Sequence, residues 1–219
     1  MSLRRVRVAG KRRRARRPHR RAALLLGLTG SVAMGKSTAA ALLRGLGIPV
    51  FDADASVHTL MGPKGRATAA IARHFPTAVN AAGVDRKALG AQVFGDPKAL
   101  AALEAIIHPL VQRERMRFLA RAGRKKVIAF DIPLLFEGAG PAAYDAVLVV
   151  SAPAFLQRKR ALARPGMTAE KFAGMRARQW SDAKKRQAAD AVIPTSLGKR
   201  ETLRRIKQFL ALRTGRTKF

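Results

Sequence analysis

The stretch LTGSVAMGKST, residues 28–38, constrains this chain more than any other segment. Gly30 is followed after four residues by Gly35, Lys36 and Ser37. Glycine lets the backbone turn so that successive N–H groups point at one oxyanion, and a following helix adds its positive N-terminal end. The spacing therefore predicts a phosphate-binding loop in which Lys36 reaches the β- and γ-phosphates and the Ser37 hydroxyl takes a Mg²⁺ position.

The context of this loop supports the same interpretation. An apolar run at residues 24–28 precedes it and an alanine-rich helical stretch at 38–45 follows it, which is the expected strand–loop–helix arrangement. The alternative is a glycine-containing turn whose lysine is only a surface charge. We name residues 30–38 the phosphate loop. Its expected ATP-binding members are Gly30, Ser31, Val32, Ala33, Met34, Gly35, Lys36, Ser37 and Thr38.

The rhythm of the whole chain predicts an α/β fold with a parallel sheet. Apolar runs of four to six residues alternate with longer helical patterns, and the runs are unbroken, as expected of strands covered on both faces. We expect strands near 24–29, 49–51, 127–130, 147–150 and 191–193. We expect helices near 36–46, 54–60, 65–74, 86–94, 97–122, 153–163, 168–179 and 199–212. Pro109 should kink or break the longest helix near His108.

Two acids, Asp52 and Asp54, follow the second expected strand. Ligands of open α/β sheets bind at the carboxyl ends of the strands. An extended backbone there would put both carboxylates on one side, where one could accept a proton from a substrate hydroxyl and the other could orient a metal-bound water. Alternatively, Asp54 simply caps the next helix. The spacing alone leaves both interpretations open.

Two further groups are candidates for phosphate chemistry. Asp131 ends the third expected strand, where such enzymes commonly hold Mg²⁺ through water, although a solvated acid at a strand end is the alternative. Arg160 and Arg164 are four residues apart on one expected helix and would share a face. A Pro–Gly break at 165–166 leads into a second basic helix, so the pair looks like a lid that closes over ATP; a solvated basic face is the alternative.

Charge indicates what the chain attracts rather than what it does. Lysine and arginine number 44 against 13 acids, for a net charge of +31, and eleven of the basic residues lie within residues 1–21. Non-specific binding of polyanions is expected. We expect no specific nucleic-acid partner, because neither an aromatic-rich RNA-binding stretch nor zinc-finger spacing is present.

The compartment follows from cysteine usage and from the N-terminal segment. The absence of cysteine excludes disulfides and thiolate metal sites and is compatible with a reducing cytoplasm. The apolar stretch after the basic segment imitates a secretory signal, but it runs straight into the phosphate loop, which cleavage there would destroy. We therefore expect residues 1–22 to be a disordered basic extension instead. No apolar run reaches the length of about 18 residues that a membrane span needs, so we expect a cytoplasmic protein without a membrane partner.

In the order of its motifs the chain resembles the dephospho-coenzyme A kinase family. After the loop come DAD at 52–54, IIHPLV at 106–111 and PLLFE at 133–137, and the resemblance extends over residues 24 to about 212. It implies a P-loop NTPase with a nucleotide-kinase-like, parallel five-stranded sheet. It also implies a single domain at 23–215, made of a core at 23–53, 125–152 and 188–215, a helical substrate insertion at 54–124 and a helical lid at 153–187.

The resemblance further implies a reaction and residue roles. The activity would be ATP- and Mg²⁺-dependent phosphorylation of the ribose 3′-hydroxyl of dephospho-coenzyme A by a monomer or weak oligomer. Asp54 matches the general base, Lys36 is catalytic as well as ATP-binding, and Arg160 and Arg164 match lid arginines that bind ATP. The substrate-binding candidates in the helical insertion are Asp54, Arg86 and His108, with a structural role beside Pro109 left open for His108.

One departure from the family pattern concerns the phosphate loop, where the family more usually has glycine at the position of Ala33. We expect alanine to leave the loop intact unless this position requires a positive φ. Two alternative functions remain. One is a kinase of another small hydroxyl acceptor, such as a nucleoside or nucleotide; the other is a basic nucleic-acid-binding protein with a vestigial loop.

Overall fold

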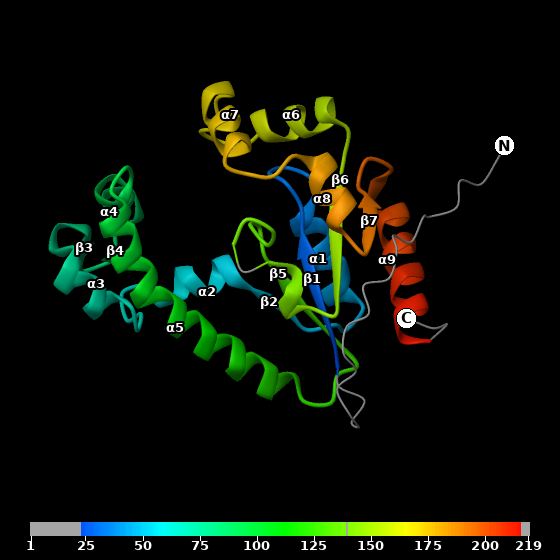
Figure 1. Ribbon diagram of the computed structural model, residues 1–219, viewed down its shortest axis with the longest axis horizontal. Helices are drawn as coiled ribbons and strands as arrows, with labels where there is room; N and C mark the ends of the chain where they lie inside the picture. Colours follow the sequence, from blue (N-terminus) through cyan, green and yellow to red (C-terminus); the bar gives the residue numbers. More distant parts are fainter. Residues whose placement is uncertain (1–22, 139, 216–219) are drawn as a thin grey trace. The chain divides into compact units, whose positions relative to one another are not determined.

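The computed structural model describes residues 23–138 and 140–215 of the protein (Figure 1). The chain divides into two compact units. The first unit contains the described residues up to Val50 and from Arg124 onward, and the second unit contains Phe51–Gly123. The basic extension expected at residues 1–22 lies outside the described residues.

The main sheet has five strands: four lie in the first unit, and the edge strand β2 begins at Val50, the last residue before the second unit. Its strands, in the spatial order β2-β5-β1-β6-β7, are β2 (Val50–Asp52), β5 (Val127–Asp131), β1 (Leu24–Thr29), β6 (Ala146–Ser151) and β7 (Ala191–Pro194). β1 pairs in parallel with β5 and β6, and β6 pairs in parallel with β7. Each strand lies within one residue of its expected bounds, so the predicted parallel sheet is confirmed.

Helices and a long loop cover the two faces of this sheet. On one face α1 (Lys36–Gly45) and α9 (Gly198–Thr214) pack their apolar sides onto β1 and β6, and Leu28, Leu43 and Leu210 are fully buried there. On the other face lies the segment after β5, and a Cβ at Gly27 would stand 2.7 Å from Leu135 Cδ1. Burial of both faces explains why the strands are unbroken apolar runs.

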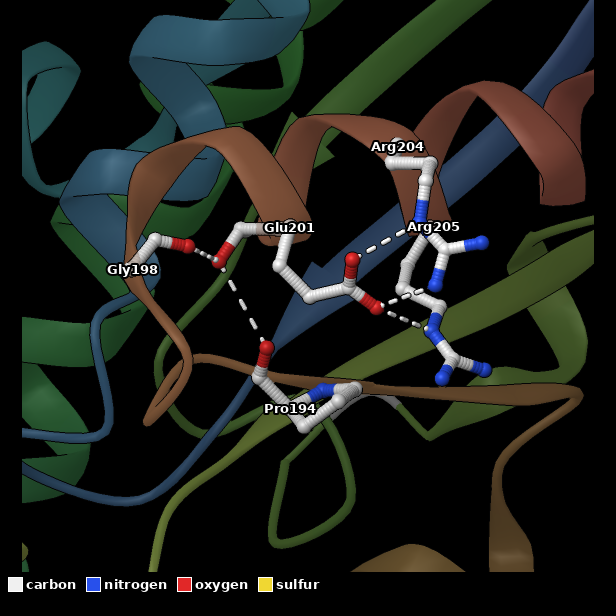
Figure 2. A network of polar contacts seen from close by, with 6 residues as sticks. Pro194, Gly198, Glu201, Arg204 and Arg205 are labelled. Atoms are coloured by element: carbon white, nitrogen blue, oxygen red, sulfur yellow. Dashed lines mark hydrogen bonds and ion pairs between the residues drawn. The ribbon is translucent and has the colours of Figure 1, made fainter. Parts of the chain in front are cut away.

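Polar contacts cluster at the N-terminal end of α9, close to the end of β7 (Figure 2). The Thr202 hydroxyl donates to the Gly198 carbonyl of the same helix at 2.9 Å and lies 3.5 Å from the carbonyl oxygen of Pro194 in β7. Glu201 pairs with Arg204 at 2.6 Å and with Arg205 at 2.8 Å. Hydrogen bonds from Arg204 and then Arg205 lower the pKa of Glu201 to about 2, so this carboxylate is ionised at any ordinary pH.

Three more helices complete the first unit: α6 (Ala154–Leu162), α7 (Ala169–Ala177) and α8 (Asp182–Ala188), together with the short 3₁₀ helix η2 (Pro141–Ala143). The first two were expected, whereas α8 was not. Because α6 ends at Leu162, Arg164 lies beyond it, and the expectation that Arg160 and Arg164 share one face of one helix is wrong. None of the helices within the described residues is long and apolar enough to cross a bilayer.

The second unit is mainly helical. It contains α2 (Ala53–Leu60), α3 (Thr68–His74), the 3₁₀ helix η1 (Pro76–Ala78), α4 (Arg86–Val93) and α5 (Pro97–Ala122). A small antiparallel hairpin of β3 (Val79–Asn80) and β4 (Gly83–Val84) had not been expected. The helices enclose an apolar core of their own, formed by Leu60, Met61, Ala67, Ile71, Phe75, Ala78, Leu89 and Ile107.

The long helix α5 is one continuous helix (Figure 1), and Pro109 lies in its interior without ending it. Asp96 caps its start by accepting from the backbone N–H groups of Lys98 and Ala99 at 2.8 and 3.1 Å. Pro109 lacks the N–H that would bond the carbonyl of the residue four positions earlier, a loss that costs about 3 kcal/mol in a helix interior. Of the expected kink or break near His108, the break is wrong: Ile107 before the proline and Leu110 and Val111 after it all pack in the apolar core of this unit.

Candidate active site

The phosphate loop lies between β1 and α1, and two of its glycines are required by its shape. At Gly30 a Cβ would stand 2.4 Å from Val150 Cγ2, too close for any side chain, because the loop crosses directly against β6. Gly35 caps α1 in a left-handed conformation with φ 93°, which glycine adopts without steric cost. The loop therefore begins and ends on positions that only glycine suits.

Ala33 also has a left-handed backbone, with φ 61°. It is the one non-glycine residue with positive φ among the described residues. Alanine was expected to leave the loop intact unless this position requires a positive φ, and the position does have one. Alanine therefore carries a steric cost of about 1–2 kcal/mol here. Its buried methyl group packs in a small cluster with Val32, Ala161 of α6 and Phe172 of α7.

Both backbone polar groups of Val32 are hydrogen-bonded to glutamine side chains. The Val32 N–H donates to Gln179 Oε1 at 3.0 Å, and the Val32 carbonyl accepts from Gln157 Nε2 at 2.9 Å. Gln157 lies on α6 and is only 3% exposed, whereas Gln179 follows the end of α7. Two segments more than a hundred residues away along the chain therefore meet on one residue of the phosphate loop.

Met34, on the other side of Ala33, is held in a similar way. Its carbonyl accepts from the Thr195 hydroxyl at 2.7 Å, and Thr195 is buried just after β7. Arg160 donates to the Thr195 hydroxyl at 3.0 Å and to the Thr195 carbonyl at 2.8 Å. The guanidinium that was expected to bind ATP is thus engaged with a residue beside the loop, and direct ATP contact remains a prediction for both Arg160 and Arg164.

Lys36 and Asp131 form an ion pair at the head of α1. Asp131 is buried at the end of β5, and Ser37 is exposed in the first turn of α1. A hydroxyl and a carboxylate are oxygen donors of the kind that Mg²⁺ prefers. No group of three or more His, Cys, Asp or Glu that could hold a metal occurs within the described residues.

Glu137 anchors the loop after β5 to α8. Its Oε1 lies 2.9 Å from Nζ of Lys185, a fully buried lysine, and accepts from the Trp180 backbone N–H at 2.7 Å. Burial acts to raise the pKa of Glu137, but the hydrogen bonds from Lys185 and Trp180 outweigh it and hold the pKa below its ordinary value. Glu137 therefore stays ionised at neutral pH.

Trp180 stacks on Phe136 with ring centroids 5.4 Å apart and planes inclined by 10°. Nζ of Lys184 lies 3.7 Å from the centroid of the same indole ring. Next to this stack opens a pocket of about 460 Å³. Its polar lining includes Ser31, Gln157, Arg176, Gln179, Trp180, Ser181 and Asp182. The Oγ of Ser31 is buried without a hydrogen-bond partner, so the pocket offers an unused polar group beside the phosphate loop.

The substrate-side candidates lie in the second unit. Asp52, not Asp54, caps α2, because its side chain accepts from the Ala55 N–H at 2.9 Å. Since α2 begins at Ala53, the extended backbone expected across both acids is wrong, and Asp54 is an exposed residue of the first helical turn. Arg86 and His108 are also exposed, on α4 and α5. These three belong to a different unit from the phosphate loop, and their roles remain predictions.

The residues that shape the loop from outside were missed by sequence reasoning. Gln157 and Gln179 occur in basic helical segments where no motif singles them out. Thr195 was detectable in principle, because it directly follows the last strand at the edge of the sheet where ligands bind. No comparable signal exists for the two glutamines.

Comparison with known proteins gives one consistent answer. The family model described as dephospho-CoA kinase matches residues 24–200. A dephospho-CoA kinase of Rhodospirillum rubrum is 54% identical over 192 residues, which cover 86% of this chain and 91% of the relative. One of Novosphingobium aromaticivorans is 54% identical over 178 residues, which cover 81% and 89%.

Solved structures agree with this result. A crystal structure of a Thermus thermophilus protein is 35% identical, with a TM-score of 0.80 over 87% of this chain and 97% of that one. A dephospho-CoA kinase from Campylobacter jejuni, at 24% identity and a TM-score of 0.56, covers 84% and 96% and supports the fold alone. The chain belongs to the dephospho-CoA kinase family.

Proposed function

We propose that this protein transfers the γ-phosphoryl group of ATP to the ribose 3′-hydroxyl of dephospho-coenzyme A, giving coenzyme A and ADP. Family membership over most of the chain supports the reaction. The observation that carries it is the phosphate loop, which is held on both sides of Ala33 at the start of α1. A loop fixed before the nucleotide arrives need not reorganise when charge develops in the transition state.

The reaction needs positioning more than covalent chemistry. The acceptor oxygen forms a bond to the γ-phosphorus, and the bond from that phosphorus to the oxygen bridging the β-phosphate breaks. Asp54 takes the proton of the acceptor hydroxyl, and its exposed carboxylate leaves it accessible to a substrate. Lys36 is placed to exchange part of its pairing with Asp131 for the β- and γ-phosphates.

Mg²⁺ is the divalent ion we propose for this reaction. The Ser37 hydroxyl would ligate it and Asp131 would act on it through water, with the nucleotide phosphates completing its shell. When bound, the metal neutralises charge on the phosphates. The protein contributes the rigid helix start on which Ser37 is carried.

The remaining roles concern the acceptor and the lid. We propose that Arg86 and His108 contact dephospho-coenzyme A, that residues 54–124 form the substrate insertion, and that residues 153–187 form a lid carrying Arg160 and Arg164. The proposal also includes a monomeric or weakly oligomeric state, a cytoplasmic location, and a core formed by residues 23–53, 125–152 and 188–215.

An acceptor competition tests the proposal directly. Purified protein is incubated with ATP, Mg²⁺ and dephospho-coenzyme A beside adenosine, cytidine monophosphate and pantetheine phosphate, while ADP release and product masses are followed. A gain of one phosphate on dephospho-coenzyme A alone is the expected result. Transfer to another acceptor instead would leave a kinase of different specificity, and no transfer at all would contradict the proposed activity.

The Lys36→Ala variant is the matched control for this assay. Loss of the Lys36 side chain should weaken ATP binding and slow turnover together, because the lysine charge acts on the same phosphates in the ground state and in the transition state. Unchanged values for both would contradict the role of the phosphate loop itself.

A further inference from the structure

The side chains of Gln157 and Gln179 bind the backbone of Val32 from two sides, one as a donor and the other as an acceptor. A buried amide is costly unless its polar atoms are bonded, and Gln157 is 3% exposed inside the face of α6 that meets the phosphate loop. Its Nε2 is used as a donor to the Val32 carbonyl at 2.9 Å. Gln179 is used in the opposite sense, as an acceptor from the Val32 N–H at 3.0 Å. The two glutamines thus hold both backbone polar groups of one residue.

The residue that follows explains why such a hold is needed. Ala33 occupies the left-handed region at φ 61°, and a strained residue persists only where its surroundings over-determine it. The Val32 carbonyl belongs to the same peptide group as the Ala33 nitrogen, so fixing that carbonyl restricts φ of Ala33. The buried methyl group of Ala33 packs against Ala161 and Phe172, which adds a second restraint from α6 and α7.

Helix α6 reaches the loop on both sides of the strained residue. Gln157 and Arg160 are three positions apart, so they project from one face of the helix. Gln157 holds Val32 directly, whereas Arg160 holds Thr195, whose hydroxyl donates to the Met34 carbonyl at 2.7 Å. One short helix therefore restrains the residue before and the residue after Ala33.

We propose that Gln157 and Gln179 are positioning residues for phosphoryl transfer: they hold Val32 so that Ala33 keeps its left-handed conformation and the loop N–H groups stay aimed at the nucleotide phosphates. The inference rests on the proposed function only for the measurements of turnover and KM, whereas the Kd for MgATP is measured without an acceptor. Neither glutamine touches the reacting atoms. Without them the loop relaxes toward conformations that alanine prefers, and both ATP affinity and turnover fall.

The first experiment compares alanine variants in the full-length chain. Gln157→Ala and Gln179→Ala should each raise the Kd for MgATP about fivefold to tenfold, the equivalent of one lost hydrogen bond to a buried group. KM for dephospho-coenzyme A should change less than about twofold. Gln187→Ala, at an exposed position of α8, is the control and should match the wild type. Unchanged MgATP affinity in both variants would overturn the proposal.

Glutamate variants distinguish the two hydrogen bonds by their direction. Gln179→Glu keeps an oxygen that accepts from the Val32 N–H, so its loss of affinity should be smaller than that of Gln179→Ala. Gln157→Glu places a carboxylate against the Val32 carbonyl and removes the donor, so it should be at least as damaging as Gln157→Ala. Both variants add one negative charge. An equal loss of MgATP affinity in the two would contradict the assigned directions of the two hydrogen bonds.

Combination with Ala33→Gly tests whether the glutamines act through Ala33. Glycine adopts the left-handed conformation without strain, so Ala33→Gly should restore at least half of the affinity lost in Gln157→Ala, measured as log Kd. If the changes in log Kd caused by Gln157→Ala and by Ala33→Gly simply add in the double variant, the two positions are not coupled and the proposal is overturned. MgATP binding is measured by calorimetry without any acceptor. A wild type that binds ATP but phosphorylates nothing would therefore contradict the proposed function and leave this inference testable.

Discussion

The two units of the molecule are stabilised in different ways. In the first unit, side chains from distant segments converge on the backbone of the phosphate loop, as Gln157, Gln179 and Thr195 do. In the second unit, the helix starts are fixed locally: Asp52 and Asp96 each bond an N–H two or three residues onward. An apolar core then joins these helices.

The difference corresponds to what each unit has to do. A phosphate loop must hold backbone N–H groups in a fixed and partly strained arrangement, which requires long-range restraints. Under the proposed function, the helices of the second unit only present side chains to the acceptor, which needs no such control of their backbone, and local caps suffice. The following experiments separate the two units by asking which property of the protein each change affects.

The largest effect is expected at Asp54. Asp54→Asn should lower kcat by about 10²–10⁴, because general-base catalysis is lost, while the Kd for MgATP stays near the wild-type value. Steady-state kinetics and calorimetry measure the two quantities. Asp52→Asn is the matched control, since asparagine caps α2 as well as aspartate does and activity should remain within a few-fold. A larger fall in kcat for Asp52→Asn than for Asp54→Asn would assign the general base to Asp52 instead.

The core of the second unit provides the next test. Ile71 is fully buried there, and Ile71→Ala should cost about 2–5 kcal/mol of unfolding free energy because a cavity forms. Denaturant unfolding measures this loss. MgATP affinity should be retained at temperatures where the variant is folded, because the phosphate loop belongs to the first unit. Leu100→Ala, at a partly exposed position of α5, should change stability by less than about 0.5 kcal/mol.

A smaller effect is expected at the Glu137–Lys185 pair of the first unit. Glu137→Gln should cost about 1–3 kcal/mol at neutral pH, because the buried lysine loses its charged partner. The pKa of Glu137 is lowered in the folded state, so its stabilisation is fully present above the ordinary value of 4.5 and is lost as pH falls through the lowered pKa.

Thermal unfolding followed from neutral pH to below pH 4.5 measures this dependence. The difference in melting temperature between the wild type and Glu137→Gln should narrow as the solution becomes acidic. A difference that stays constant over the whole range would mean that the charge of Glu137 contributes nothing.

The smallest effect is expected at Glu201, shown in Figure 2. Its ion pairs with Arg204 and Arg205 lie at the surface, where solvent screens them. Glu201→Ala should therefore shift the melting temperature by no more than about 2 °C in physiological salt. A larger shift would show that the start of α9 contributes more to the first unit than its exposure suggests.

Much of the fold could be predicted from hydropathy. The strands of the large sheet are mostly apolar runs, and helices α6 and α7 follow periodic patterns. α8 was missed because its one buried residue is Lys185, a charge that hydropathy places at the surface. The β3–β4 hairpin was missed because strands of two residues carry no periodicity.

The candidate site was predicted only where chemistry leaves a local pattern. The spacing of Gly30, Gly35 and Lys36 specifies a loop, but it does not reveal that Ala33 has positive φ or that glutamines restrain it. Contacts between residues more than a hundred positions apart depend on the packing of the whole unit. The error at Asp52 and Asp54 was different in kind, because a shift of two residues in the helix start decides which acid is the cap.

The stacked indole of Trp180 has a spectroscopic consequence. It is the single tryptophan of the chain, so emission excited at long ultraviolet wavelengths comes from one ring held between Phe136 and Nζ of Lys184. The same ring borders the pocket beside the phosphate loop. Any ligand or mutation that separates the loop after β5 from the start of α8 changes the surroundings of that ring, and the protein carries its own optical label for the event.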